Sequence, residues 1–123
     1  MQIRIANRQD EAPVRGLLEA AGNKLDLSAS GADHDLHNID QNYFGHDGIF
    51  LVAERDGNVV AFAGARCEGD DKNKLVLRRM FLGGTEGSGT TSELREKFLA
   101  IIKNHAYQLD FKTVEVPEAS AAV

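Results

Sequence analysis

The sequence predicts an α/β fold, with a mixed, mostly antiparallel sheet of about five strands and helices on both faces. Three observations lead to this prediction. Residues 49–55 and 58–67 are rich in apolar residues and are joined by Asp56-Gly57, a dipeptide typical of a two-residue hairpin. Residues 74–116 have the pattern of a strand, a glycine-rich turn, a long amphipathic helix and a further strand. Because hairpins are antiparallel and strand–helix–strand units are parallel, the sheet is expected to be mixed.

The first third of the chain predicts one strand and two helices. Apolar and polar residues alternate from residue 2 to 6, as in a half-buried strand. Asp10 is suited to cap the helix that follows, and Gly22 is suited to end it. Asp33 is suited to cap a second, short helix that ends near Gly45.

The longest helix is expected to begin directly after the glycine-rich turn. Residues 90–92 are threonine and serine, which are good helix caps. Apolar residues then recur with the 3.6-residue spacing of an α-helix, so one stripe faces the sheet. This predicted stripe consists of Leu94, Phe98, Ile101, Ile102, His105 and Leu109. With a short strand at residues 111–116, the element order is β-α-α-β-β-β-α-β.

Length and composition limit the function classes. A chain of 123 residues fits a single domain, residues 1–123. A net charge of −5 without any basic run argues against nucleic acid as the main partner. No apolar run approaches the length of a membrane span, so we expect no membrane partner. The lone Cys67 gives no indication of an oxidising compartment, and we expect a cytoplasmic protein.

The glycine-rich turn at residues 83–89 is the clearest chemical signal in the sequence. A turn of this kind points several backbone N–H groups toward one place, at the positive end of the following helix. Such a place binds anions, most often phosphate. The alternative is a plain loop, in which case the chain would be a small dimeric module without a cofactor.

The order of these elements resembles the cofactor-binding core of the Gcn5-related N-acetyltransferase (GNAT) superfamily. Residues 77–82, Leu-Arg-Arg-Met-Phe-Leu, are similar to the fourth strand of that family. Residues 50–64 are similar to its second and third strands. The resemblance extends over residues 2–116.

The phosphate turn follows the family pattern only in part. The family has Arg/Gln-x-x-Gly-x-Gly/Ala between its fourth strand and third helix. Gly87 and Gly89 match the common Arg-Gly-x-Gly form of this turn. Glu86 replaces the basic residue and Thr91 replaces the final small residue. A carboxylate near a pyrophosphate is expected to weaken binding by about 1–4 kcal/mol at surface-like dielectric.

The resemblance implies transfer of an acetyl group from acetyl-CoA, as co-substrate, to an amine of a small molecule or peptide. In the family, backbone groups of the fourth strand bind the pantetheine arm, and the turn binds the pyrophosphate. The cofactor-binding residues implied for this chain are Met80, Phe81, Leu82, Gly87, Ser88, Gly89, Thr90, Thr91 and Ser92. The alternative is a catalytically impaired relative that binds coenzyme A or has a structural, dimeric role.

Catalytic and acceptor residues are less clearly marked. Glu54 is the preferred general base, acting through water, because it follows the apolar run toward the middle of the sheet. Glu68, Asp70 and Glu115 are other carboxylates beside the strands, and for each of the four the alternative is a solvated strand-end charge. Tyr43 and Phe44 lie where the family places its acceptor-site wall, with core packing as the alternative.

Two further groups of charged residues have competing interpretations. His34 and His37, with Asp33 and Asp35, could approach a metal site. Without a third ligand at a defined spacing a polar helix start is the preferred interpretation, and we expect no metal. Arg78 and Arg79 are adjacent on a predicted strand, so we expect them to point to opposite faces.

The chain ends soon after the last predicted strand. Members of the family usually continue with another helix and two further strands, and that helix often carries a tyrosine that protonates the departing thiolate. The chain thus resembles a C-terminally shortened member. A strand at residues 113–116 would be an open sheet edge, which folded proteins avoid. We therefore expect a homodimer formed through this C-terminal strand edge.

Overall fold

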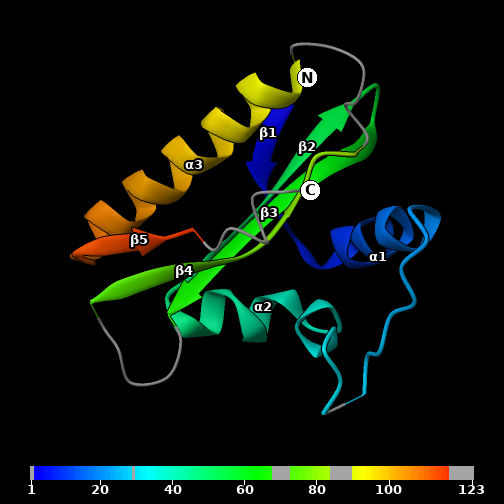
Figure 1. The fold of residues 1–123 in the computed structure, drawn as a ribbon, viewed down its shortest axis with the longest axis horizontal. Helices are drawn as coiled ribbons and strands as arrows, with labels where there is room; N and C mark the ends of the chain where they lie inside the picture. Colours follow the sequence, from blue (N-terminus) through cyan, green and yellow to red (C-terminus); the bar gives the residue numbers. More distant parts are fainter. Residues whose placement is uncertain (1, 29, 68–72, 84–89, 117–123) are drawn as a thin grey trace.

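The computed structural model describes residues 2–28, 30–67, 73–83 and 90–116. Five strands form one sheet in which neighbours in sequence are neighbours in space (Figure 1). All neighbouring pairs are antiparallel except the last two strands, which are parallel. The strands are β1 (Gln2–Ile5), β2 (Ile49–Arg55), β3 (Asn58–Cys67), β4 (Lys74–Phe81) and β5 (Thr113–Glu115). The predicted mixed, mostly antiparallel sheet is confirmed.

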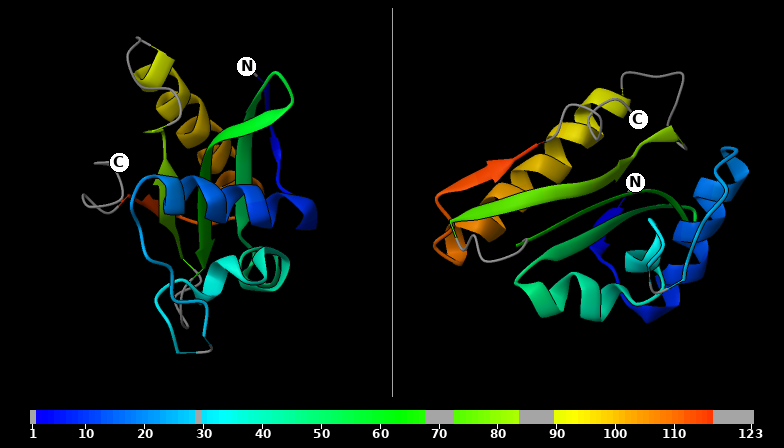
Figure 2. Two further views of the ribbon diagram at one scale, coloured as in Figure 1. Left: turned by 90° about the vertical axis from the view of Figure 1, so that its right-hand side faces the viewer. Right: turned by 60° about the horizontal axis from the view of Figure 1, so that its bottom comes forward.

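Helices cover both faces of this sheet, as predicted (Figure 2). The long helix α3 (Thr90–Gln108) lies on one face, and α1 (Glu11–Ala20) and α2 (Ile39–Asn42) lie on the other. Short 3-10 turns flank α1 and α2, namely η1 (Arg8–Asp10), η2 (His34–Leu36) and η3 (Phe44–His46). Within the described part of the chain, no helix is both long enough and apolar enough to span a membrane.

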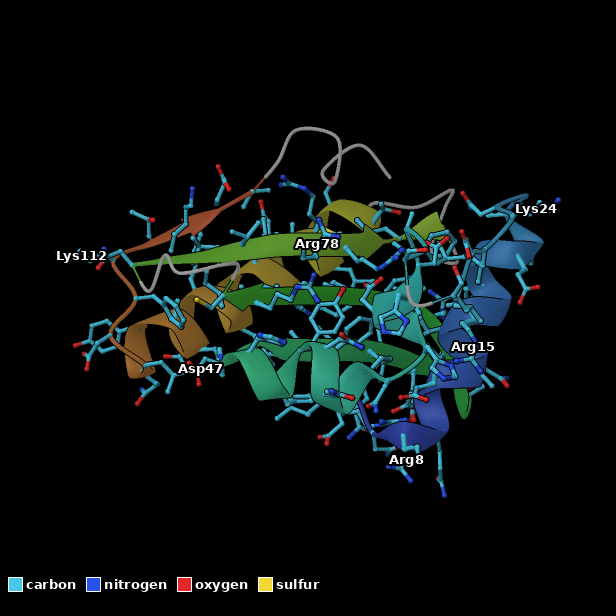
Figure 3. All side chains as sticks on the ribbon, turned by 90° about the horizontal axis from the view of Figure 1, so that it is seen from below. Arg8, Arg15, Lys24, Asp47, Arg78 and Lys112 are labelled. Carbon is cyan, nitrogen blue, oxygen red and sulfur yellow. The ribbon has the colours of Figure 1, made fainter. Side chains whose placement is uncertain are left out.

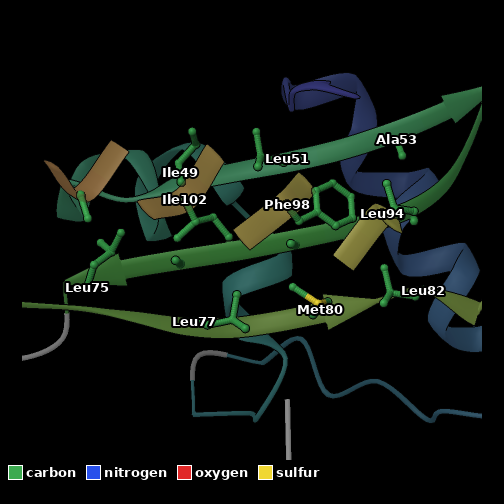
Figure 4. Packing of buried hydrophobic residues seen from close by; sticks show 14 residues of the cluster. Ile49, Leu51, Ala53, Leu75, Leu77, Met80, Leu82, Leu94, Phe98 and Ile102 are labelled. Atoms are coloured by element: carbon green, nitrogen blue, oxygen red, sulfur yellow. The ribbon is translucent and has the colours of Figure 1, made fainter. Parts of the chain in front are cut away.

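Each face of the sheet has its own apolar core. Between the sheet and α3, side chains of α3 pack on alternate residues of β2, β3 and β4 (Figure 4). The buried α3 residues of this core are Leu94, Phe98, Ile102 and Ala106. On the other face, stacked rings of Phe50, Phe62 and Phe81 run across three strands beneath α1 and α2. Two separate cores explain why the central strands are apolar on both sides.

Two predicted turns have the expected backbone. Asp56 and Gly57 both have positive φ, 53° and 82°, as a two-residue hairpin of this type requires. Gly22 has a φ of 94° at the end of α1, where the Asn23 N–H donates to the Leu18 carbonyl. This hydrogen bond spans the helix end in the way typical of a glycine stop.

The structure corrects the predicted end of the apolar stripe on the long helix. Leu109 is 47% exposed, whereas Ala106 is buried. The reason is that α3 ends at Gln108 and the chain turns at Asp110, whose φ is 63°. The Phe111 N–H closes this end by donating to the Ala106 carbonyl. Leu109 therefore lies beyond the surface that the helix presents to the sheet.

The predicted second helix is also corrected, because the segment is three short turns rather than one helix. Asn38 has φ −149° and ψ 87°, values that no helix contains, and it separates η2 from α2. Its side chain accepts a hydrogen bond from the Gln41 N–H and thereby starts α2. An asparagine that caps the second turn ends the first one, which explains the break.

The structure replaces Asp10 by Asn7 as the cap of the first helical segment. The Asn7 side chain accepts from the Gln9 N–H, and the Asp10 carboxylate accepts from the Asn7 N–H. Asp10 thus has the third-residue position of a capping box, because the 3-10 turn starts before α1. The same carboxylate pairs with Arg4 on β1 at 2.7 Å.

Candidate cofactor site

The β4–β5 opening is the place where these two parallel strands stop pairing. Their register runs from Lys74 opposite Thr113 to Val76 opposite Glu115 and then ends. β4 continues to Phe81, and among the described residues no strand pairs with residues 77–81 on the β5 side. We use the name β4–β5 opening for this stretch. It runs toward the C-terminal end of β4, which lies near the start of α3 (Figure 1).

Buried side chains line β4 beside the opening. Met80 and Leu82 pack into the core under α3, while Phe81 stacks on Phe62 in the other core at 5.5 Å between ring centroids. All three side chains are buried. A ligand in the opening would therefore meet the main chain of β4 rather than these side chains. Backbone N–H and C=O groups are strong hydrogen-bonding groups whatever the residue type.

The start of α3 is the second part of the candidate site. The helix begins at Thr90, and its first-turn N–H groups point toward the end at which the helix dipole is positive. The Thr91 side chain is half-buried and that of Ser92 is exposed. The predicted binding residues Gly87, Ser88 and Gly89 lie outside the described residues.

A β-bulge shapes β4 within the opening. Ala65 of β3 pairs with Leu77, whereas Gly64 pairs with Arg79, so one residue of β4 is extra. Leu77 and Met80 both face α3, which places the two arginines between them on the opposite face. Figure 3 looks onto that face, with Arg78 labelled on β4. The prediction that Arg78 and Arg79 point to opposite faces is wrong, because it assumed an unbroken strand.

Arg79 is the centre of a partly buried ionic group, which we call the Arg79 cluster: Arg79, Asp33, Asp35 and Tyr43. The Arg79 Nε donates to Asp35 Oδ2 at 2.6 Å and its Nη2 donates to Asp35 Oδ1 at 2.7 Å. The same Nη2 donates to Asp33 Oδ1 at 2.9 Å. The Tyr43 hydroxyl donates to Asp35 Oδ2 at 2.5 Å. The cluster joins β4 to η2 and to the end of α2.

Charge and burial act against each other in the Arg79 cluster. Burial alone would raise the pKa of Asp35, but the Arg79 guanidinium and the Tyr43 hydroxyl together lower it below its usual value. Burial, with the Asp35 carboxylate, raises the pKa of the Tyr43 hydroxyl well above its usual value. Asp35 is therefore an anion and Tyr43 a neutral donor at pH 7.

Glu54, the expected general base, is held by an arginine. Its Oε1 accepts from Arg4 Nε at 2.8 Å, and the same arginine bridges to Asp10. Glu54 lies on β2, two strands from β4, and its pairing partners on either side are Gln2 and Val59. The base role stays a prediction, and this ion pair does not favour it. Of the other carboxylates considered, Glu68 and Asp70 lie outside the described residues.

Tyr43 and Phe44 differ in what they could offer an acceptor. The Tyr43 side chain is fully buried, between the Phe50 ring and the Arg66 guanidinium. It packs in the core, which is the alternative interpretation given above, so a place in an acceptor wall stays a prediction that this burial does not favour. Phe44 is half-buried and lines a hollow of about 250 Å³ next to Ala6. That hollow lies beside the end of β1, away from the β4–β5 opening.

The aspartates of the possible metal group are engaged elsewhere. Asp33 and Asp35 both pair with Arg79, and the rings of His34 and His37 lie 6.2 Å apart. In the described parts of the chain, no group of three or more metal-ligating side chains is found.

Sequence reasoning missed the Arg79 cluster itself. Its only sequence signal is an arginine next to an apolar run.

Comparisons with known proteins agree with this architecture. No protein-family model matches the chain, and no curated protein matches it. Solved structures do match. An acetyltransferase from Streptococcus agalactiae has a TM-score of 0.72 at 21% identity, covering 95% of this chain and 73% of its own. A GNAT-family acetyltransferase from Staphylococcus aureus has a TM-score of 0.65 at 24% identity, covering 84% and 66%.

A third similar structure contains a bound ligand. It is an aminoglycoside N-acetyltransferase in complex with coenzyme A, with a TM-score of 0.65 at 18% identity, covering 98% of this chain and 84% of its own. All three likenesses lie below 25% identity, so they concern the fold. The chain has the α/β fold of the GNAT acetyltransferases, and it spans about two thirds of the length of the Staphylococcus structure.

Proposed function

We propose that the protein binds acetyl-CoA along the β4–β5 opening and transfers its acetyl group to an amine of a small molecule or peptide. The observation that supports this most is that β4 and β5 stop pairing at Val76 and Glu115. From there β4 runs on alone toward the start of α3. The pantetheine arm would lie along residues 77–81, which have no strand partner on the β5 side among the described residues. The pyrophosphate would lie at the first turn of α3 and the preceding residues.

The transfer itself needs little from side chains. A neutral amine nitrogen attacks the thioester carbonyl, a C–N bond forms, the C–S bond breaks, and the thiolate leaves. The amine loses one proton to a base or to water, and the thiolate gains one. A main-chain N–H of β4 placed at the carbonyl oxygen would stabilise the charge that develops there. Orientation of the two reactants would supply much of the remaining acceleration.

A catalytically impaired coenzyme A-binding relative is the second candidate. The observation that favours it is the Glu54–Arg4 ion pair, which holds the expected base against β1, two strands away from β4. Binding would then occur without release of thiol. Both proposals place the protein in the cytoplasm.

We expect acetyl-CoA to stabilise the protein, since a ligand that binds only the folded state adds RT ln(1 + [L]/Kd). At a hundredfold excess over Kd this amounts to about 2.7 kcal/mol, measured as a rise in Tm.

Ser92→Asp should weaken binding, because it puts a carboxylate beside the pyrophosphate at a cost of about 1–4 kcal/mol. The helix should tolerate this change, since an acidic residue is favourable in the first turn.

Asn104→Asp is the matched control, because it adds the same charge to an exposed position far along α3. Its dissociation constant for acetyl-CoA, from calorimetry, should stay within a factor of two of the wild type. No thermal shift at millimolar acetyl-CoA would contradict cofactor binding. A shift without thiol release from acetyl-CoA in the presence of amines would favour the impaired relative.

We also propose that the protein is a homodimer in which the β5 strands of two copies lie together. β5 is the last strand in the order of the described sheet, and Thr113 and Glu115 are exposed. Continuation of the sheet across two copies would pair the backbone groups of this edge. Sedimentation at micromolar concentration should give twice the mass of one chain. A single-chain mass would contradict the dimer and leave the cofactor proposal untouched.

A further inference from the structure

Arg79 connects the bulge of β4 to the segment between α1 and α2. Its guanidinium binds the carboxylates of Asp33 and Asp35, and its Nη2 also donates to the Ala32 carbonyl at 3.3 Å. The side chains of Arg79 and Asp33 are 17% and 18% exposed, so water screens their ion pair only in part. Asp33 precedes the short turn η2 and Asp35 lies in it, so these ion pairs anchor to β4 a segment with little regular structure of its own.

Asp33 also binds the residues that precede it. Its Oδ1 binds Arg79, and its Oδ2 accepts from the Asp26 N–H at 3.0 Å. The Asp33 N–H in turn donates to the Asp26 carbonyl at 3.0 Å. Gly31 packs so closely on Asp26 that a Cβ there would collide with the Asp26 backbone oxygen. Residues 26 and 33 are thus held together, and one carboxylate connects them to β4.

The two neighbours of the anchored Asp26 form a wall of a hollow of about 450 Å³. Leu25 and Leu27, which flank Asp26, are both half-buried and both line it. The hollow is completed by Glu19, Gly22, Asn23 and Lys24 at the end of α1. Its volume is in the range of small-molecule sites. The hollow and the Arg79 cluster belong to the same face of the sheet, because Leu27 of the hollow and Tyr43 of the cluster pack in the same core.

We propose that Arg79 is a positioning residue that, through Asp33, holds the wall of this hollow in the shape that binds the acceptor amine. This inference rests on the proposed transferase function and names the part of the chain that recognises the second substrate. Arg79 contacts neither substrate. The Arg79 backbone lies in the bulge of β4, at the β4–β5 opening. The same residue would therefore fix the position of the wall relative to the place proposed for the acetyl group.

Asp33→Asn tests the proposal, since it weakens the contact with Arg79 and keeps the size of the side chain. Amide hydrogen exchange over residues 22–33 should become faster by about tenfold, as expected for loss of roughly one charge-assisted hydrogen bond. In steady-state assays of thiol release, KM for the amine should rise by about tenfold. The kcat value and the calorimetric Kd for acetyl-CoA should stay within about twofold. The amine probes are kanamycin, spermidine and a tripeptide with a free alanine N-terminus.

Three comparison variants make the result specific. Asp110→Asn removes an exposed carboxylate at the end of α3 and should change none of these values. Gly31→Ala disturbs the same segment without touching Arg79 and should reproduce the rise in KM. Arg79→Lys keeps the charge but not the forked contacts, so its effect should lie between wild type and Asp33→Asn.

The outcomes separate this inference from the function on which it rests. Unchanged exchange in Asp33→Asn would overturn the anchoring. Faster exchange with an unchanged KM for the amine, or with an equal loss of acetyl-CoA affinity, would overturn the role in acceptor binding. A wild-type protein that binds no acetyl-CoA, or transfers to none of the three probes, would instead overturn the proposed function as an active transferase.

Discussion

Replacing Asp35 by alanine is expected to lower the free energy of unfolding by about 3–5 kcal/mol, the range for breaking a buried ion pair from one side. Asp35 is 6% exposed and accepts from both Arg79 and the Tyr43 hydroxyl. Its loss leaves a guanidinium with one carboxylate instead of two and a buried hydroxyl without its acceptor. Urea denaturation at pH 7 measures the change.

The pH dependence of this effect has a defined sign. The pKa of Asp35 is lowered in the folded protein, so near that pKa the unfolded state binds more protons than the folded state. The stabilisation is complete above the unfolded value of about 3.9 and is lost as the pH falls through the folded value. The difference between wild type and Asp35→Ala should therefore narrow below about pH 4. A difference that is constant from pH 7 to pH 2.5 would contradict the ionic origin of the stabilisation.

Phe98→Ala is expected to destabilise the protein by about 3–5 kcal/mol, as is typical of truncating a buried phenylalanine. Phe98 is completely buried in the middle of α3, facing the sheet core (Figure 4). The substitution removes its contacts and leaves a cavity between helix and sheet. Tyr107→Ala is the control on the same helix, because Tyr107 is 78% exposed. It should change stability by no more than about 0.5 kcal/mol. Similar midpoints in urea for the two variants would contradict the assigned facing of α3.

Local chemistry determined most of the secondary structure. The bounds of β2 and β3 agree with the prediction to the residue, because Asp56-Gly57 allows one tight turn and the flanking apolar runs have one consistent pairing. The β4–α3–β5 unit was predictable for a similar reason. Apolar residues with the spacing of a strand are followed by a glycine-rich turn, by capping residues and by apolar residues with the spacing of a helix. Misjudged boundaries, as at Asn38 and Leu109, lie where a single side chain or turn ends an element.

The candidate site was predictable only as far as it depends on the backbone. The start of α3 and the strand before it were expected, and the structure describes both apart from residues 84–89. Glu54 was expected as a free carboxylate, yet Arg4 binds it, because an antiparallel β1 brings residues 50 apart in sequence into contact. A sequence does not show which opposite charge such a pairing will place beside a carboxylate.

By itself, therefore, the sequence determined the strands, the long helix, the hairpin and the mixed sheet, since these depend on periodicity and turn chemistry within short stretches. Only the tertiary structure decided the bulge of β4, the common face of Arg78 and Arg79, the ion pairs of Arg79 and Glu54, and the place where β4 and β5 separate. Each of these depends on contacts between residues far apart in the chain. The physical reason is that a bulge or an ion pair is fixed by the free energy of the whole packed arrangement.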